Sequence, residues 1–353
     1  MFLSFKEFTA CVLAACLFVS CQKESRERFT SVEVTPVYID SVNVRALAPL
    51  DENRVWFGAN HGKVGLIDND TPKLAIIKYE DKLLHFRSIA RTENAVFVLS
   101  IASPAVLYKI GFNDKKATNI EMVYHESGEG VFYDSMRFWN DQEGIAIGDP
   151  MDDCMAIIIT RDGGNSWTKL SCDVVPKAEK GEVAFAASNS NIAVYDTHAW
   201  IATGGSNSRV YHTPDKGNTW EVYDTPIIKG GPMTGIFTID FWDENRGIIL
   251  GGDWKQQDNK VANKAITTDG GKTWKLFGEN MEPGYRTSVR YVPGMDGLGV
   301  VAVGPPNGIY FSGNGGEAWD KISDDVFFAI EFVNDSIAFA SGENKISKLV
   351  FKK

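Results

Sequence analysis

One short turn occurs four times in this chain, and this repeat constrains the fold more than any other feature. The copies are TRDGGNSW, TPDKGNTW, TTDGGKTW and SGNGGEAW, and they begin at Thr160, Thr213, Thr267 and Ser312. They recur about every 50 residues, and self-similarity at such a period predicts an architecture of repeated units. In each copy an apolar run enters the turn and a Trp opens the next run, which indicates a hairpin between two strands.

Each turn belongs to a larger unit. The segments FWNDQEGIAIGD (138–149) and FWDENRGIILGGD (241–253) precede two of the turns, and each reads as a strand, an Asn/Asp-rich turn and a second strand ending at Gly. A third strand, the repeated turn and a fourth strand complete the unit. Four antiparallel strands in about 50 residues are typical of one β-propeller blade. No stretch has a convincing helical period, so the sequence predicts an all-β chain.

We expect residues 31–353 to form a single β-propeller of seven four-stranded blades. The last blade has only three strands of its own, and we expect the N-terminal segment 31–39 to close it as the fourth. Six and eight blades stay open, because the first two units are weakly patterned. The expected blades cover 44–80, 84–124, 132–172, 183–224, 235–277, 286–322 and 327–351.

The N-terminus has the pattern of a targeting segment. An apolar stretch within residues 1–20 is too short to span a membrane and suits a signal peptide. It ends at Cys21 and a polar run follows, which resembles a bacterial lipoprotein signal with Cys21 as the lipidated mature N-terminus. A cleaved signal without lipid is the alternative. We expect 21–30 to be a tether and the protein to lie in the cell envelope, on the periplasmic or outer-membrane surface, attached to the membrane through lipid alone.

Two further cysteines flank the first repeated turn. If residues 155–160 and 167–172 pair as antiparallel strands, Cys154 falls within one position of Cys172. A cross-strand disulfide is then feasible in an oxidising compartment. Two free buried thiols are the alternative.

The repeated pattern Ser/Thr-x-Asp-x-Gly-x-x-Trp resembles the Asp-box, or BNR repeat, of sialidase-type propellers. The strand-turn-strand segments before it are similar to the family of photosystem II stability and assembly factors and its bacterial relatives. The resemblance implies that the boxes are structural and lie on the face opposite the functional one. The box residues are Asp162, Trp167, Asp215, Trp220, Asp269, Trp274, Asn314 and Trp319, with Asn in place of Asp in the last copy.

The loops of the opposite face carry the candidate binding residues. Long polar loops on a rigid scaffold often carry function, and a Trp beside charged residues is a typical recognition anchor. The candidates are Tyr133, Asp134, Asp149, Asp153, Glu182, Arg209, Asp253, Trp254 and Arg286. Asp149, Asp152 and Asp153 offer an alternative cation site, although their spacing fits no EF-hand-like loop.

The remaining features favour a non-catalytic scaffold that binds an envelope protein or a glycan. A formal charge of -10 argues against nucleic acid as the partner. No dinucleotide-binding, Cys-x-x-Cys or Gly-x-Ser-x-Gly motif is present and the five His are scattered, so we expect no cofactor, no metal site and no catalytic residue. We expect a monomer.

Two enzymatic alternatives stay open. One is a glycoside hydrolase of the sialidase or xyloglucanase-like propeller type. A sialidase needs three converging arginines, for which Arg45, Arg209 and Arg286 are the candidates, but its Arg-Ile-Pro signature is absent. The other is an oxidoreductase, a label that some relatives in the family carry, with no cofactor site visible in this sequence.

Overall fold

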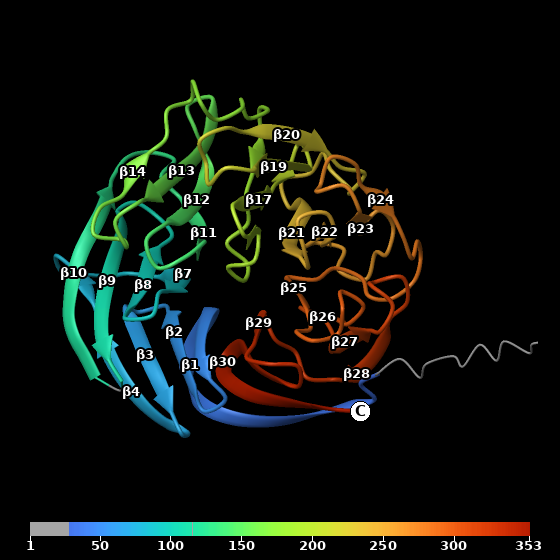
Figure 1. The fold of residues 1–353 in the computed structure, drawn as a ribbon, viewed down its shortest axis with the longest axis horizontal. Coiled ribbons are helices and arrows are strands. Elements are labelled where there is room, and N and C mark those ends of the chain that lie inside the picture. Colours follow the sequence, from blue (N-terminus) through green and yellow to red (C-terminus); the bar gives the residue numbers. More distant parts are fainter. Residues whose placement is uncertain (1–27, 115) are drawn as a thin grey trace, which may run out of the picture.

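The computed structural model describes residues 28–114 and 116–353. The predicted signal segment 1–20, the lipidation site Cys21 and most of the predicted tether lie outside the described residues. The described residues form strands arranged as a ring of radiating sheets, a single all-β propeller (Figure 1). No helix in these two ranges is long and apolar enough to cross a membrane.

The strands group into six large sheets. The first contains β29 (Ala329–Phe332), β30 (Ile337–Lys352), β1 (Ser31–Asp51), β2 (Arg54–Ala59), β3 (Lys63–Asp68) and β4 (Thr71–Ile76). The second contains β7 (Phe86–Arg91), β8 (Ala95–Ser100), β9 (Ala105–Asn113) and β10 (Lys116–Glu126). The third contains β11 (Tyr133–Phe138), β12 (Gly144–Met151), β13 (Cys154–Thr160) and β14 (Thr168–Lys169).

The other three sheets complete the ring. The fourth contains β16 (Ile192–Tyr195), β17 (His198–Ala202), β19 (Arg209–Thr213) and β20 (Glu221–Asp224). The fifth contains β15 (Glu182–Val183), β18 (Gly204–Gly205), β21 (Thr234–Phe241), β22 (Gly247–Asp253), β23 (Lys264–Thr267) and β24 (Lys275–Leu276). The sixth contains β25 (Ser288–Tyr291), β26 (Val300–Val303), β27 (Ile309–Ser312) and β28 (Asp320–Ser323), and a small hairpin joins β5 (Lys78–Tyr79) to β6 (Lys82–Leu83).

The prediction of seven four-stranded blades is wrong. If each hydrogen-bonded sheet of four or more strands is one blade, the described residues form six blades, two of which have six strands. The reason is the length of β1. Its first part pairs with β30, from Ser31 opposite Lys352 to Asn43 opposite Glu343, and its second part pairs with β2. The strands expected to form a separate last blade are therefore continuous with the first sheet, in which the first and last described strands pair with each other.

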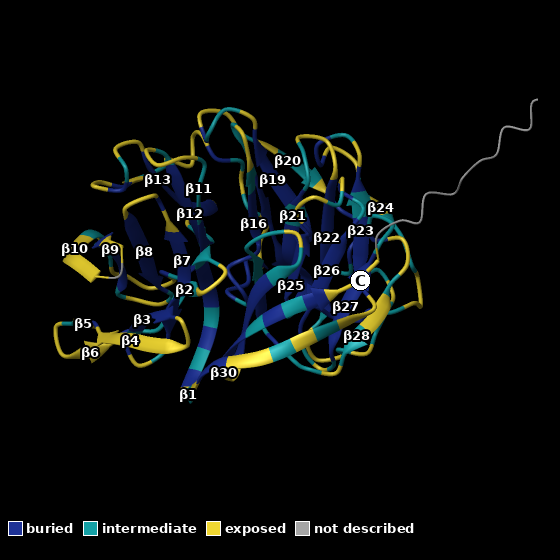
Figure 2. Cartoon of the chain, turned by 60° about the horizontal axis from the view of Figure 1, so that its bottom comes forward, coloured by how far each residue is buried: buried dark blue, intermediate teal, exposed yellow. Residues whose placement is uncertain are grey.

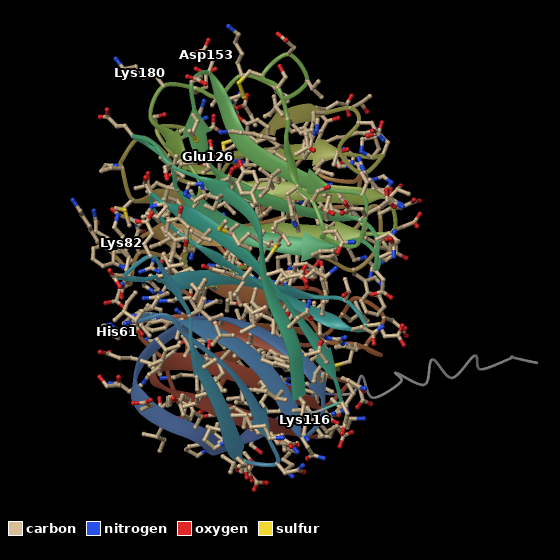
Figure 3. All side chains as sticks on the ribbon, turned by 90° about the vertical axis from the view of Figure 1, so that its left-hand side faces the viewer. His61, Lys82, Lys116, Glu126, Asp153 and Lys180 are labelled. Carbon is tan, nitrogen blue, oxygen red and sulfur yellow. A yellow bond between two sulfur atoms is a disulfide. The ribbon has the colours of Figure 1, made fainter. Side chains whose placement is uncertain are left out.

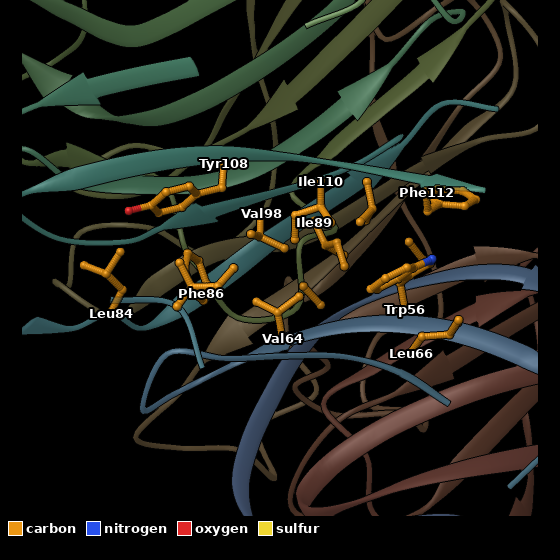
Figure 4. Close-up of a cluster of buried hydrophobic side chains, with 14 of the residues drawn as sticks. Trp56, Val64, Leu66, Leu84, Phe86, Ile89, Val98, Tyr108, Ile110 and Phe112 are labelled. Carbon is orange, nitrogen blue, oxygen red and sulfur yellow. The ribbon is translucent and has the colours of Figure 1, made fainter. Parts of the chain in front are cut away.

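Apolar side chains between neighbouring blades form the core. Trp56 and Val64 of the first sheet pack against Phe86, Val98 and Tyr108 of the second (Figure 4). Burying a side chain of this size contributes about 1.5–3 kcal/mol. The strands near the channel are largely buried, whereas the outer strands β4 and β10 and the connecting loops are more exposed (Figure 2).

The four repeated turns share one hydrogen-bond pattern. In the first, the Gly164 N–H donates to Thr160 Oγ1 at 2.9 Å and the Ser166 N–H donates to Asp162 Oδ1 at 3.0 Å. Asn314 accepts the Ala318 N–H at 2.9 Å in the same way, because the turn needs an acceptor oxygen and not a charge. Gly164 has φ +75°, where a side chain would be strained.

The propeller has two distinct faces. His61, Lys82 and Lys180 lie along one of them, here called the upper face, whereas Lys116 in the β9–β10 hairpin lies nearer the other (Figure 3). The repeated turns join the same pair of outer strands in their blades as the β9–β10 hairpin does in its own, so they belong to the lower face.

A disulfide joins Cys154 and Cys172, with the two Cα atoms 5.5 Å apart. Two backbone contacts also hold this region together. Cys154 and Lys177 form an isolated β-bridge, and the Ala178 N–H donates to the Asp153 carbonyl at 2.8 Å. Closing a loop of this size stabilises the fold by about 3 kcal/mol in the chain-entropy model.

Candidate functional site

The segment 185–191, here called the plug, lies inside the ring against the inner strands of several blades. Asn189 donates from Nδ2 to the Ile89 carbonyl of β7 at 2.8 Å and accepts the Met136 N–H of β11 at 3.0 Å. Ser190 donates to Thr238 Oγ1 of β21 at 2.9 Å. Because the plug is bonded to inner strands of several blades, it forms a fixed floor inside the ring.

A cavity of about 430 Å³ lies above this floor, and we call it the cup. Its walls are mostly apolar, with Phe185 stacked on Phe237 at 3.9 Å between ring centroids and Phe237 edge-on to Tyr285 at 4.7 Å. Polar groups enter the cup at three lining residues, Arg45, Arg87 and Asp149. A concave, mainly apolar site with a few polar groups is the usual form of a binding pocket.

Among the described residues, neither arginine of the cup forms an ion pair with a carboxylate. Arg45 donates to Asn43 Oδ1 at 2.8 Å and to the Ala187 carbonyl at 3.2 Å, and its guanidinium lies 3.6 Å from the centroid of the Phe328 ring. Arg87 donates to the Ala186 carbonyl at 3.2 Å. Burial, and then the charge of Arg87, lowers the pKa of Arg45 to about 10, so it remains a cation at neutral pH.

Two carboxyl groups lie beside these cations. Asp149 lines the cup and accepts the Ala184 N–H at 2.8 Å. Asp134 is fully buried, and the backbone N–H of Ala186 lies close enough to favour its ionised form, although neither carboxylate oxygen has a hydrogen-bond partner of normal geometry. Burial raises the pKa of Asp149 to about 6. Burial, and then the charge of Asp149, also raises the pKa of Asp134, which the Arg87 charge only partly offsets.

The local backbone explains why the two carboxyls meet. Tyr133 pairs with Gly148 and Ser135 pairs with Ile147, so Asp134 is the extra residue of a β-bulge between β11 and β12. The Asp149 N–H donates to the Phe132 carbonyl at 2.9 Å next to this bulge. Bulges redirect side chains and are common beside functional sites.

Three of the other predicted residues are used inside the fold. Glu182 is fully buried and pairs with Arg209 at 2.5 Å, and Tyr211 donates to the same carboxylate at 3.2 Å. Arg286 is also fully buried, donates to the Asn307 carbonyl at 2.9 Å and lies over the Tyr310 ring. Arg209 and Arg286 therefore do not join Arg45 in one site, as a sialidase would require.

The remaining predicted residues are distributed around the upper face. Tyr133 is buried and donates to Glu126 at 2.7 Å. Asp153 is exposed and lies 3.4 Å from Lys177. Asp253 accepts the Lys255 N–H and shapes its loop, whereas Trp254 is 48% exposed and lines the cup. The structure thus brings Asp149 and Trp254 into the cup.

Sequence reasoning missed the plug and the placement of Arg87 beside Arg45 in the cup. One usable signal was the recurrence of an Arg near the start of the first strand in successive units, in NVRAL and HFRSI. The plug, with its small residues, carried no signal of its own. Within 28–114 and 116–353 no three His, Cys, Asp or Glu side chains are grouped as a metal site would require.

The lower mouth of the channel holds a second cavity of about 530 Å³ with a different charge arrangement. Glu331 accepts hydrogen bonds from Arg137 at 2.7 Å and from Arg290 at 2.8 and 3.0 Å. Burial opposes ionisation of Glu331, but the charges of the two arginines outweigh it and lower its pKa to about 2. This network satisfies its own charges.

Comparison with known proteins supports the fold. Residues 155–290 match the model of the Sortilin-Vps10 family, described as sortilin, neurotensin receptor 3, which is a β-propeller family. A search of curated protein sequences found no significant match.

Several solved propellers superpose on nearly the whole chain. YCF48 bound to a D1 peptide aligns with TM-score 0.66 and 12% identity, over 93% of this chain and 99% of that one. YCF48 from Cyanidioschyzon merolae gives TM-score 0.61 and 14% identity, over 91% and 98%. The RRP9 WD40 repeats give TM-score 0.62 and 10% identity, over 92% and 99%. At these identities the likeness defines the class of protein, a β-propeller.

Proposed function

We propose that this chain is a non-catalytic scaffold that holds a segment of a partner protein in the cup, in the manner of an assembly or stability factor. The observation that carries the proposal is the pair Arg45 and Arg87, two cations that form no ion pair among the described residues, in a mostly apolar cup that also contains Asp149. Such a site suits a peptide segment with an acidic group beside an apolar or aromatic side chain.

The rim of the cup supports a protein ligand. Trp254 is 48% exposed beside the cup, and its backbone N–H donates to the Met233 carbonyl at 3.0 Å. A large aromatic side chain on an anchored backbone is a common hot spot of protein interfaces. The superposition on YCF48, a propeller that has been solved with a D1 peptide, adds a precedent for a peptide ligand on this fold. The repeated turns then serve as Asp-boxes on the opposite face.

The cup favours this reading over a glycoside hydrolase. A glycosidase needs two carboxyl groups that both reach the substrate. Of Asp134, Asp149, Asp153, Glu182 and Asp253, only Asp149 lines the cup. Asp134 is fully buried and Glu182 is engaged by Arg209.

A screen with a displayed library of short random peptides tests the binding function. We expect enriched peptides to carry an acidic group next to an apolar one, and R45Q/R87Q to weaken their binding at least tenfold. The matched control is R91Q, since Arg91 is an exposed arginine at the lower mouth. Enrichment that survives R45Q/R87Q, or that is lost equally in R91Q, would contradict the proposal.

We further propose that the scaffold is anchored in the cell envelope by lipid at Cys21. The apolar stretch before this cysteine and the polar run after it support the proposal. Mass spectrometry of the mature N-terminus should find an acylated Cys21, and C21S should move the protein from the membrane to the soluble fraction. An unmodified mature N-terminus at another residue would refute the anchor and leave the binding function untouched.

A further inference from the structure

The unpartnered carboxylate of Asp134 is the feature of the site that the binding function does not explain. A buried polar group without a hydrogen bond is costly, and natural proteins keep few of them. Here the group is an acid, fully buried, at a β-bulge directly beneath the wall of the cup. Its nearest charged neighbours are Asp149 and Arg87.

Two adjacent carboxyl groups in a buried place are most stable when at least one of them is protonated. Two adjacent acids in a poorly solvated site cannot both ionise without strong repulsion, so one proton is retained between them. Asp149 has one oxygen held by the Ala184 N–H, while no hydrogen bond of normal geometry occupies the oxygens of Asp134, which can therefore take part in a shared hydrogen bond.

We propose that Asp134 and Asp149 form a proton-binding pair that sets the charge of the cup, so that an anionic ligand binds to Arg87 and Arg45 together with a proton from solvent. When the pair carries a proton, the arginines face the ligand with an excess of positive charge. When Asp149 loses its proton, its carboxylate competes with the ligand for the arginines, while Asp134 stays protonated. This inference rests on the proposed function of the cup.

The other groups around the pair do not supply this switch. His85 accepts a hydrogen bond from Arg87 Nε at 3.3 Å, and burial, and then the Arg87 charge, lowers the pKa of this His to about 4, so it is neutral near neutral pH. Burial raises the pKa of Tyr285 well above its usual range, so it stays protonated. The remaining charged or titratable groups that act on Arg45, Arg87 or His85 are His61 and Glu343.

The pair can be tested without a ligand by a carboxyl-carbon NMR titration of the mature protein labelled at its aspartates. We expect an aspartate transition near pH 6 in the native protein. In D149N this transition should disappear, and the pKa of Asp134 should fall towards the ordinary aspartate range, because the neighbouring charge is removed. D153N changes an exposed aspartate of the adjacent loop and should leave the transition in place. Ordinary titration of both Asp134 and Asp149 would overturn the pair.

The coupling to ligand binding is tested with benzoate, which combines a carboxylate with an aromatic ring. We expect its affinity to fall about tenfold for each pH unit above the transition, the slope for one linked proton. D149N should abolish most of this dependence. A pH-independent affinity in the native protein would overturn the coupling, as would no benzoate binding at any pH.

The failures of the two proposals are distinguishable. If R45Q/R87Q still binds benzoate, the cup is not the anion site and the proposed function fails, whatever the titration shows. If R45Q/R87Q loses benzoate and the native protein titrates in the ordinary range, the binding site stands and only the proton pair fails.

Discussion

Arginines and carboxylates line both ends of the central channel, but they are paired differently. At the lower mouth, Glu331 accepts three hydrogen bonds from Arg137 and Arg290. In the cup, Arg45 and Arg87 donate to backbone carbonyls of the plug instead of to a carboxylate. Charges that satisfy one another close a structure, whereas charges left with weaker partners are available to a ligand. The lower mouth therefore has charges that satisfy one another, whereas the cup has two cations held only by weaker partners.

The largest expected effect is at the sealed mouth. E331Q should reduce the free energy of unfolding by about 3 kcal/mol, since it leaves two largely buried arginines without their counter-ion. The measurement is a urea titration followed by Trp fluorescence. The control E93Q changes an exposed acid that lines the same cavity and should stay within about 0.5 kcal/mol. A loss no larger than that of E93Q would show that Glu331 is not the counter-ion that stabilises the two arginines.

The two mouths should also give opposite pH slopes. The pKa of Asp149 is raised to about 6 in the folded protein. Its contribution to folding stability is therefore fully present below the pKa that it has in the unfolded chain, and this contribution is lost as the pH rises through about 6. The pKa of Glu331 is lowered to about 2, so its contribution is complete above its unfolded pKa and is lost as the pH falls through about 2.

Thermal unfolding across this pH range measures both slopes. D149N should flatten the decline of stability on the alkaline side, and E331Q should flatten the decline on the acid side. Identical pH profiles for the two variants would show that the mouths do not differ electrostatically.

A smaller change in stability is expected in the cup. R45Q/R87Q should lower the free energy of unfolding by no more than about 1.5 kcal/mol. The double variant loses hydrogen bonds to the Ala187 and Ala186 carbonyls, but it also removes the repulsion between two cations. Urea titration beside E331Q measures the difference directly. A cost equal to that of E331Q would mean that these arginines hold the plug and are not reserved for a ligand.

The smallest effect on stability is expected at the rim. W254A should change the free energy of unfolding by less than about 0.5 kcal/mol, because nearly half of this side chain is exposed. The same variant should weaken binding of the selected peptides. Trp274, whose indole N–H donates to the Gly271 carbonyl at 2.9 Å, offers the contrast, since W274A should destabilise the fold. Equal losses in both variants would assign Trp254 a structural role.

The repeated turns made the all-β propeller predictable, because their pattern depends on local hydrogen bonds such as those of Asp162 with its own turn. The number of blades was not predictable in the same way. It depends on where one long strand, β1, changes partner from β30 to β2, and nothing in its sequence marks that point.

The candidate site was predictable only in part. Trp254 and Asp149 follow from their place in polar upper loops, but the polarity of Glu182 and Arg209 gave no sign that they pair with each other inside the fold. Pairing across the ring is a tertiary property, and so is the approach of the plug to Arg45. A single sequence reports which side chains are charged, whereas their partners come from the fold.

The pairing of β1 with β30 also sets an order of events during synthesis. The first described strand, β1, cannot pair with β30 until the end of the chain has been synthesised, because Ser31 pairs with Lys352. Until then, β1 presents an unpaired edge of the kind that associates with other chains. A truncation that removes β30 should therefore reduce the stability and solubility of the protein far more than the number of lost residues implies. The shortened chain would have an open ring, and the unpaired edge of β1 would remain free to aggregate.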